Sequence, residues 1–489
     1  MGFLKRKTVI VFVLLLSFSI AWSQSKTTAE KANAIYSIND YLDAYIANNI
    51  DLQTLRLEVE EAQAELDKIN IENGVDLTVS SGSSTVSVDD GDVSLDIAPS
   101  LTVTVPKANN TVITTSAPVT LSDDSTYFDE AGVSVSTDII PSTTNEWKLS
   151  VEKYERALFE AQLAVDTKLI SLKSDFWQAL YDIYSADKTM KEDADDLYDD
   201  QIDFETIKAQ GYSENSSSYR TAQLDVQEDI FTVEKDKRNL DTLLAQFAVD
   251  CGLGPSDLTQ IPSLPKEYYS IELVDFDNYD KNKYIDLEDA IQDYEYQTKV
   301  RAADSDFSLT ADAGYDYTGY SNTAYNDTDD DEGNALSTGL TATYGGLSTS
   351  VGVSSLLEDF TNPSLTFSFS YDFGTHKTDA IDDKEDDIDR RTELLVIESA
   401  KESWEDDKLD ADTNKATYEW TRKQNAEQLA LYKDMYEDSK DWFQRGIIAE
   451  TDFLQAKNSY ETKIDDSILT VIDCIMYNLG IEQLFVGAK

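Results

Sequence analysis

The sequence predicts an α+β protein that contains the same structural unit twice. Three observations carry this prediction: two long segments without proline, several stretches in which apolar and polar residues alternate, and a glycine directly after each long segment. Each unit is expected to contain a short helix, then strands, then a long helical hairpin that turns at the glycine. This duplicated order limits the possible architectures more than any single residue does.

Residues 1–23 are predicted to be an export signal. A basic start at 5–7 precedes an apolar core from Val9 to Ile20, and small residues follow at the expected cleavage position. The apolar core has roughly twelve residues, which is too short for a helix to span a bilayer. No later segment reaches the roughly eighteen uninterrupted apolar residues that a spanning helix needs, so any membrane crossing is expected to be made by strands.

The charge of the chain excludes one class of function. There are 95 acidic residues against 40 basic ones, and the formal net charge is −55. Nucleic-acid binding needs clustered Lys and Arg, so it is not expected here. Acidic runs such as 192–200 and 382–389 are interpreted as solvated helix faces. The alternative is that some of these acids line a water-filled conduit and favour cations.

The first unit is expected to open with a helix that begins at Ile38 and continues to about Asn70. The second unit opens in the same way at Ile285. Both openings place apolar residues three and four positions apart, which is typical of a helix with one buried face.

Strands are expected after each opening helix because the hydrophobic period changes to two. The alternating apolar residues are Val93, Leu95, Ile97, Leu101, Val103, Val105, Phe307, Leu309, Ala311, Ala313, Tyr315, Tyr317, Leu365, Phe367, Phe369, Tyr371 and Phe373. This pattern fits membrane strands with one lipid-facing side. It fits a soluble antiparallel sheet packed on a core equally well.

Two long helices are predicted at about 145–210 and 377–445. At 1.5 Å per residue each would be about 100 Å long, some three times the apolar thickness of a bilayer. Each is expected to turn at a glycine, Gly211 or Gly446, into a returning helix. The returning helices are expected to close near Gly252 and at Gly480, so the second would be shorter by about one heptad.

The two units are expected at 24–252 and 284–489, with a linker at 253–283. Pro255, Pro262 and Pro265 break any helix in the linker. Cys251 and Cys474 lie near the ends of the two returning helices, and two free core thiols are preferred over a disulfide bridge.

No catalytic, cofactor or metal site is predicted. The acidic loop 326–334 does not fit the calcium-loop template and is interpreted as solvated. The single histidine, His376, is placed at a strand-to-helix junction. Nucleophile, phosphate-loop and zinc signatures are not recognised, so the chain is not expected to be an enzyme.

Two motifs resemble the TolC-like outer-membrane efflux family. The segment 41–44, Tyr-Leu-Asp-Ala, followed by Asn48-Asn49, is similar to the family's start-of-repeat motif. The segment 446–456 is similar to its turn motif, in which a glycine is followed six residues later by an aspartate, here Asp452. The order and duplication of these motifs extend the resemblance over nearly the whole mature chain.

The resemblance implies an α+β membrane protein that forms a homotrimer. Strands from each copy would form one outer-membrane β-barrel, continued by a periplasmic α-helical tunnel. The family would supply two strands between residues 75 and 140, and this segment holds more alternating stretches than that. Such a trimer would be the exit duct of a tripartite efflux or type I secretion system, with a periplasmic adaptor protein, an inner-membrane pump and outer-membrane lipid as partners. The rival interpretation is a surface-exposed or periplasmic structural coiled-coil protein without channel activity.

The resemblance also implies where the gate and the docking site lie. The tunnel entrance is expected at acids beside the second turn, and adaptor docking at both turns. The gate candidates are Asp438, Asp441, Glu450 and Asp452, and the docking candidates are Gly211, Tyr212, Ser213, Gly446, Ile447 and Ile448. Asp452 either faces the lumen or a neighbouring copy, or is a plain helix-start acid. The second aspartate of the family's entrance pair is replaced by Gln455, and Ser217 occupies the position of Asp452 in the first unit.

Overall fold

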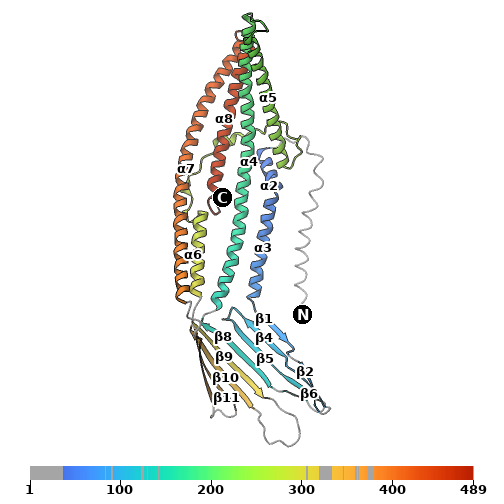
Figure 1. Cartoon of the computed structure of the whole chain (residues 1–489), viewed down its shortest axis with the longest axis vertical. Helices are drawn as coiled ribbons and strands as arrows, with labels where there is room; N and C mark the ends of the chain where they lie inside the picture. The colour runs from blue at the N-terminus through green and yellow to red at the C-terminus, as the bar shows by residue number, and fades with distance from the viewer. Residues whose placement is uncertain are drawn as a thin grey trace.

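A computed structural model describes residues 37–487 except 83, 90–91, 123–125, 129, 141–142, 304–306, 319–332, 345, 358–360, 362 and 373–378. The expectations for the export signal, for most of the acidic loop and for His376 fall outside the described residues. Within them, the molecule is elongated, with helices along most of its length and strands at one end (Figure 1).

The helices follow the same order in both units. The first unit has α2 (Ile38–Asn48), α3 (Ile50–Glu72), α4 (Thr143–Ala209) and α5 (Ser217–Asp250). The second has α6 (Ile285–Ala303), α7 (Asp379–Gln444) and α8 (Glu450–Gln483). The long helices α4 and α7 contain 67 and 66 residues, close to the predicted bounds. No helix of the described residues is both long and apolar enough to cross a membrane.

The Asn48-Asn49 pair has a structural explanation. The Asn49 side chain accepts a hydrogen bond from the Leu52 amide at 2.8 Å and so caps α3. The Asn48 amide donates to the Asp250 carbonyl at the end of α5, at 3.4 Å. One residue therefore starts the next helix while its neighbour binds the end of a helix about 200 residues later in the chain.

The helices of each unit lie side by side, and the two units meet mainly where α8 packs on α4. In the half that contains the turns, α8 packs between α4 and α7, and α5 packs on the other side of α4. In the half next to the strands, α3 packs on α4 and α6 packs on α7. The turns lie together at the end opposite the strands (Figure 1).

The expected difference of one heptad between the returning helices is wrong. Helices α5 and α8 both contain 34 residues. Gly252 has a φ of 73° and follows the end of α5, whereas Gly480 lies inside α8, which continues to Gln483. The glycine marked a helix end in the first unit only, since Gly480 keeps helical backbone geometry and so does not interrupt α8.

The main sheet contains eight antiparallel strands, four from each unit. The first unit supplies β1 (Asp76–Ser80), β4 (Ser100–Val105), β5 (Thr111–Ser116) and β8 (Glu130–Ile140), and the second supplies β9 (Phe307–Thr318), β10 (Gly333–Tyr344), β11 (Leu347–Leu356) and β12 (Ser364–Tyr371). Their order is β1-β4-β5-β8-β9-β10-β11-β12. The first unit therefore supplies more strands than the two that the resemblance implies, in keeping with its surplus of alternating stretches. In the second unit, β10 and β11 were missed.

A second sheet extends four strands of the first unit. It contains β2 (Ser84–Asp89), β3 (Asp92–Ile97), β6 (Val119–Ser122) and β7 (Thr126–Phe128), in the order β2-β3-β6-β7. Pro99 and Pro118 separate β3 from β4 and β5 from β6. Proline cannot donate to a ladder, so both strands break there and continue in a separate sheet.

Two hydrophobic cores lie at mid-height, and the linker packs against both. The first core joins α2, α4, α5 and α8, and the second joins α6, α7 and the end of α8. The linker carries the short 3-10 helices η1 (Lys266–Ser270), η2 (Phe276–Asn278) and η3 (Lys281–Lys283). Cys251 and Cys474 are free and buried, as preferred from the sequence.

Candidate functional site

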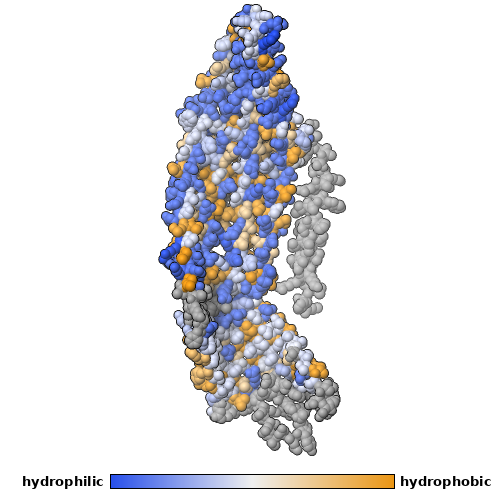
Figure 2. Space-filling model, viewed as in Figure 1, coloured by the Kyte–Doolittle hydropathy of each residue, from blue (hydrophilic) through white to orange (hydrophobic). Residues whose placement is uncertain are grey.

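The two turns have the glycine geometry that the sequence predicted. Gly211 and Gly446 have φ values of 77° and 70°, and no atom lies near the position of an added side chain. The Gly446 amide donates to the Phe443 carbonyl and the Ile447 amide to the Trp442 carbonyl, each at 2.9 Å, which satisfies the end of α7. Beside these glycines, Tyr212 and Ile447 are 47% and 64% exposed. This end of the molecule is mostly hydrophilic (Figure 2).

The four gate candidates do not converge within one chain. The Asp452 carboxylate accepts a hydrogen bond from the Ala449 amide at 3.2 Å, at the start of its own helix. Asp441, in the last turn of α7, forms an ion pair at 2.8 Å with Arg445, which directly follows the helix. Asp438 and Glu450 are exposed. In the described chain, Asp452 thus has the position of a helix-start acid.

The sequence reasoning missed a series of polar contacts between α4 and α8, here called the polar ladder. Gln455 donates to Asp199 at 2.6 Å and Ser459 donates to Asp195 at 3.4 Å. Further from the turn, the ladder contains two ion pairs, Lys191–Asp465 at 2.6 Å and Lys188–Asp466 at 2.8 Å. The ladder connects the outgoing helix of the first unit to the returning helix of the second.

The two ion pairs of the ladder differ in burial and in pKa. Asp465 is 3% exposed, and this burial raises its pKa to about 6 although Lys191 donates to it. Burial also opposes the charge of Asp466, but hydrogen bonds from Lys188 and Lys463 lower its pKa. Asp187 is a second partner of Lys191 at 2.6 Å, so the lysine remains charged between two carboxylates.

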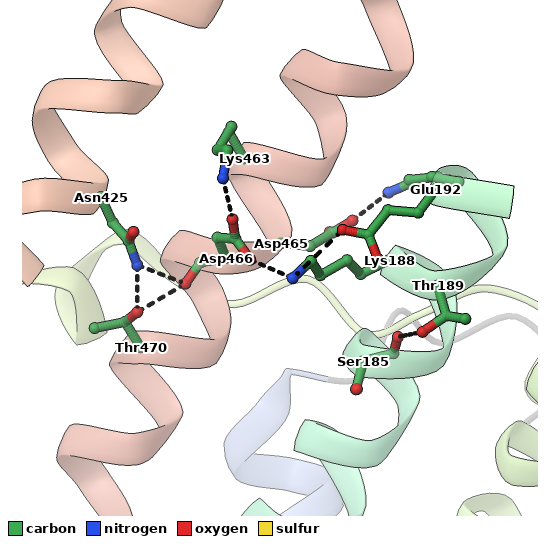
Figure 3. Close-up of polar contacts among 10 residues, drawn as sticks. Ser185, Lys188, Thr189, Glu192, Asn425, Lys463, Asp465, Asp466 and Thr470 are labelled. Carbon is green, nitrogen blue, oxygen red and sulfur yellow. Dashed lines mark hydrogen bonds and ion pairs between the residues drawn. The ribbon is translucent and has the colours of Figure 1, made fainter. Parts of the chain in front are cut away.

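Helix α7 joins the ladder through an amide (Figure 3). The Asn425 side chain donates to the Thr470 hydroxyl at 2.6 Å and to the Asp466 carbonyl at 3.3 Å. Lys463 donates to the Asp466 carboxylate at 2.7 Å from the same helix. Three helices from the two units therefore meet at Asp466.

A sequence signal for the ladder existed. Cations are scarce in this chain, yet Lys188 and Lys191 lie three residues apart and so share a helix face. Asp465 and Asp466 interrupt the apolar stripe of the returning helix, where an unpaired charge would be costly. These two features together predict a buried pairing, although they do not say which helices form it.

The opposite side of α4 carries acids that face acids. Asp193 shares a hydrogen bond with Asp236 of α5, and this contact, together with burial, raises its pKa to about 6. Burial and the neighbouring Asp200 raise the pKa of Asp229 in the same interface. This second set is called the acid seam.

The linker holds α7 and α8 through its backbone. Arg422 of α7 donates to the carbonyls of Ile271 and Tyr269 at 2.6 and 2.5 Å. Asn478 of α8 accepts from the Val274 amide and donates to the Glu272 carbonyl, both at 2.9 Å. At mid-height the helices are thus fixed, in contrast to the exposed turns.

The main sheet has two chemically different faces. The cross-strand register places apolar residues on one face of all eight strands, including Leu77, Val79, Val103, Ile113, Val135, Tyr315, Leu340, Val351, Phe367 and Phe369. The other face carries Ser, Thr, Gly and Asp, for example Thr102, Ser134, Asp312, Thr341 and Ser368. Phe367 and Phe369 are 68% and 72% exposed, so this part of the apolar face is left uncovered by the residues that the structure describes.

Aromatic residues mark the ends of this apolar face. Phe307, Tyr344 and Tyr371 lie in one cross-strand row with Leu347, at the end of the sheet that adjoins the helices. Tyr315 and Tyr317 of β9 lie toward the other end. Rows of aromatic residues at both rims are typical of strands whose apolar band meets lipid.

Exposed apolar side chains also follow both lateral edges of the helical part. On α7 these include Leu395, Leu409 and Trp420, and on α3 and α5 they include Leu57, Leu224 and Phe231. In Figure 1, α7 forms one edge of the molecule and α3 and α5 form the other. Apolar rows of this kind mark surfaces that contact another protein. Among the described residues, no group of three or more His, Cys, Asp or Glu side chains is placed to hold a metal ion.

Comparisons with known proteins identify two domains and one fold. Residues 41–267 match the TP096X N-terminal domain and residues 270–488 match the TP096X C-terminal domain. Among curated proteins, no sequence matches this chain.

Among solved structures, CusC, studied for the conformational changes that accompany folding and transmembrane channel formation, matches with a TM-score of 0.50 and 12% identity, over 92% of each chain. The Campylobacter jejuni CmeC outer membrane channel matches with a TM-score of 0.44 and 14% identity, over 91% of this chain and 86% of that one. The open state of the Neisseria gonorrhoeae MtrE outer membrane channel matches with a TM-score of 0.45 and 13% identity, over 91% of this chain and 88% of that one. The likeness to CusC establishes the fold.

Proposed function

The chain is a protein of two TP096X domains with the fold of the TolC-like outer-membrane channels, and we propose that three copies form the exit duct of an export system. The duct lies in the outer membrane, with a large periplasmic portion formed by the helices. It carries cargo and catalyses nothing.

The two-faced sheet is the observation that carries this proposal. An apolar face crosses eight strands and carries aromatic residues toward both ends, and Phe367 and Phe369 on it are left exposed by the described residues of the chain. Soluble monomers rarely expose a patch of this kind, whereas lipid would cover it at no cost. The Ser- and Thr-rich face would then line water, as the inner face of a membrane barrel does.

The two lateral edges support the assembly of several copies side by side, which we propose to be a trimer. The apolar residues of α7 lie on one edge and those of α3 and α5 on the other, so the edge of one copy can pack on the opposite edge of the next. A head-to-tail contact of this type gives a ring when the rotation from copy to copy closes, as three copies about a threefold axis would. In the ring, helices of all copies would surround one tunnel that continues the barrel.

The gate of this duct lies at the turns, and the polar ladder is its latch within each copy. The linker fixes the helices at mid-height through its backbone. Near the turns the helices are joined by ring contacts, such as Phe443 with Phe453, and by single hydrogen bonds, such as Gln455 to Asp199. Opening would require α8 to move away from α4, which breaks contacts such as Lys191–Asp465 and Gln455–Asp199. Asp452, Glu450, Asp441 and Asp438 lie beside this seam and would favour cations at the entrance.

The exposed turn residues are the docking surface for an adaptor. Tyr212 and Ile447 present large apolar side chains at the end of each hairpin, next to Ser213 and the half-buried Ile448. A periplasmic adaptor and an inner-membrane pump would supply small molecules for efflux or polypeptide for type I secretion.

The test is purification from the membrane fraction in detergent, followed by mass measurement and recording in planar bilayers. We expect a particle of about three chains of 54.7 kDa and a small, cation-selective conductance. Lys191→Met should raise the conductance, whereas Lys168→Met, on the same helix but outside the ladder, should not. If the chain is instead a structural coiled-coil protein, the purified particle will be stable but will not conduct ions. That result would contradict the channel proposal.

A further inference from the structure

The main sheet of a single chain ends in two open edges. In the described part of the chain, β1 forms a ladder with β4 alone and β12 with β11 alone. All residues of both edge strands are exposed. An exposed strand edge is a template for pairing with another chain unless it is covered.

The two edges are complementary to each other. Every neighbouring pair in the sheet is antiparallel, and the number of strands is eight, so β1 and β12 run in opposite directions. Leu77 and Val79 of β1 lie on the same apolar face as Phe367 and Phe369 of β12, through the continuous cross-strand register. Pairing of β12 from one copy with β1 from the next would therefore be antiparallel and would keep the apolar face unbroken.

We propose that this pairing joins three copies into one closed sheet of twenty-four strands, three times the eight of each chain. This proposal rests on the trimeric duct proposed above. It goes further by specifying the number of strands, and therefore the width, of the part that lies in the membrane. Two strands per repeat, the number that the resemblance implied for the first unit, would give twelve strands in a trimer. Each repeat supplies four instead, so the closed sheet has twice that circumference.

The strand count sets the diameter of the lumen. With strands ~4.8 Å apart and tilted by ~40°, twenty-four strands close at a backbone diameter of about 48 Å, against about 24 Å for twelve strands. A folded domain of 100 residues has a radius of gyration of about 13 Å, so polypeptide cargo of that size fits within the wider lumen. The outer-membrane part would therefore not limit the size of the cargo. The narrow end of the tunnel at the helical turns would set that limit.

Cysteine cross-linking at the edges tests the pairing in the full-length protein. Leu77→Cys or Val79→Cys is combined with Leu365→Cys, Phe367→Cys or Phe369→Cys, and purified trimers are oxidised with copper phenanthroline. Cys251 and Cys474 are buried and remain in place. We expect at least one pair to give covalent dimers and trimers on a non-reducing gel. The matched control joins Phe367→Cys with Val103→Cys on the interior strand β4, and it should give monomers only.

Electron microscopy of the same trimers supplies the second measurement. A transmembrane ring about twice as wide as one with four strands per chain supports the proposal. Trimers that conduct but show the narrow ring and no edge cross-link would overturn the twenty-four-strand sheet and leave the duct intact. Failure to form a trimer, or trimers without conductance, would instead count against the proposed function.

Discussion

The two sides of α4 differ in charge, although they belong to one helix. Toward α8, Lys188 and Lys191 face Asp465 and Asp466, and the contact is a set of ion pairs. Toward α5, Asp193 faces Asp236, and like groups meet. At neutral pH the contact between α4 and α8 is stabilised by pairs of opposite charge. The contact between α4 and α5 persists although its carboxylates repel each other. The difference teaches that the buried acids between the units have lysine partners, although burial still raises the pKa of Asp465 to about 6. Within the first unit the Asp193 carboxyl meets another acid, so that contact depends on protonation.

The largest expected effect comes from removing the buried cation of the ladder. Lys191→Met leaves Asp465 without its lysine in a site where it is 3% exposed. Breaking a buried ion pair from one side costs 3–5 kcal/mol, and partial exposure of Lys191 lowers our expectation to about 2–3 kcal/mol. The unfolding midpoint of the purified protein in a fixed detergent measures this loss.

Lys188→Met is the matched control for that substitution. Asp466 also binds Lys463 at 2.7 Å, so it keeps a cation when Lys188 is replaced. We expect a clearly smaller decrease in the midpoint than with Lys191→Met. Equal decreases in the unfolding midpoint would show that the Lys191–Asp465 and Lys188–Asp466 ion pairs contribute equally, in spite of their different burial.

The acid seam predicts a pH dependence of the contact between α4 and α5. The folded-state pKa of Asp193 is raised from 3.8 to about 6 by Asp236 and by burial, with Asp196 and Glu192 nearby. Since the raised pKa favours the protonated form, its contribution to stability is present at low pH and is lost as pH rises through about 6. Hydrogen exchange in 217–250, corrected for intrinsic rates, should be slower at pH 5 than at pH 7.5.

Asp193→Asn tests the origin of that dependence. The amide cannot ionise, so the difference between pH 5 and pH 7.5 in this segment should shrink. Asp466 has the opposite pH dependence because its pKa is lowered. Its contribution to the stability of the fold is present at neutral pH and is lost only as pH falls below 3.8. If exchange in the α5 segment is unchanged by Asp193→Asn at both pH values, the acid seam does not control this interface.

A pair of turn substitutions compares the two hairpins directly. Gly211→Ala and Gly446→Ala each place a side chain on a residue with positive φ, 77° at Gly211 and 70° at Gly446. No neighbouring atom interferes with the added side chain at either site. The cost is backbone strain of about 1 kcal/mol at either site. Proteolysis at the turns should rise equally in both variants. A larger increase for Gly446→Ala would indicate that strain there also loosens the ladder.

The smallest effect on stability is expected for Asp452→Ala. This change removes the hydrogen bond to the Ala449 amide and a favourable helix-start charge, at a cost of about 0.5–1 kcal/mol. Conductance should rise if the carboxylate also narrows the entrance of the assembled tunnel. A conductance and selectivity that stay at the wild-type values would limit Asp452 to its role at the helix start.

The sequence predicted features that depend on local patterns and missed those that depend on pairing. The bounds of α4 and α7 followed from the absence of proline and from periodicity, and the turns followed from glycine. Strands β10 and β11 were missed because Gly339, Gly352 and many Ser and Thr residues weaken their alternation. The polar ladder joins Lys191 to Asp465 across 274 residues, and no local pattern specifies such a partner.

Helix α8 is the last helix of the second unit, yet it contributes to both hydrophobic cores. Ile472 and Ile475 belong to the core of α2, α4 and α5, and Tyr477 and Ile481 belong to that of α6 and α7. Neither repeat can complete its interior until α8 has been synthesised. Closing contacts over such separations is slow, so the chain would remain unfolded long enough to be carried across a membrane before its cores form.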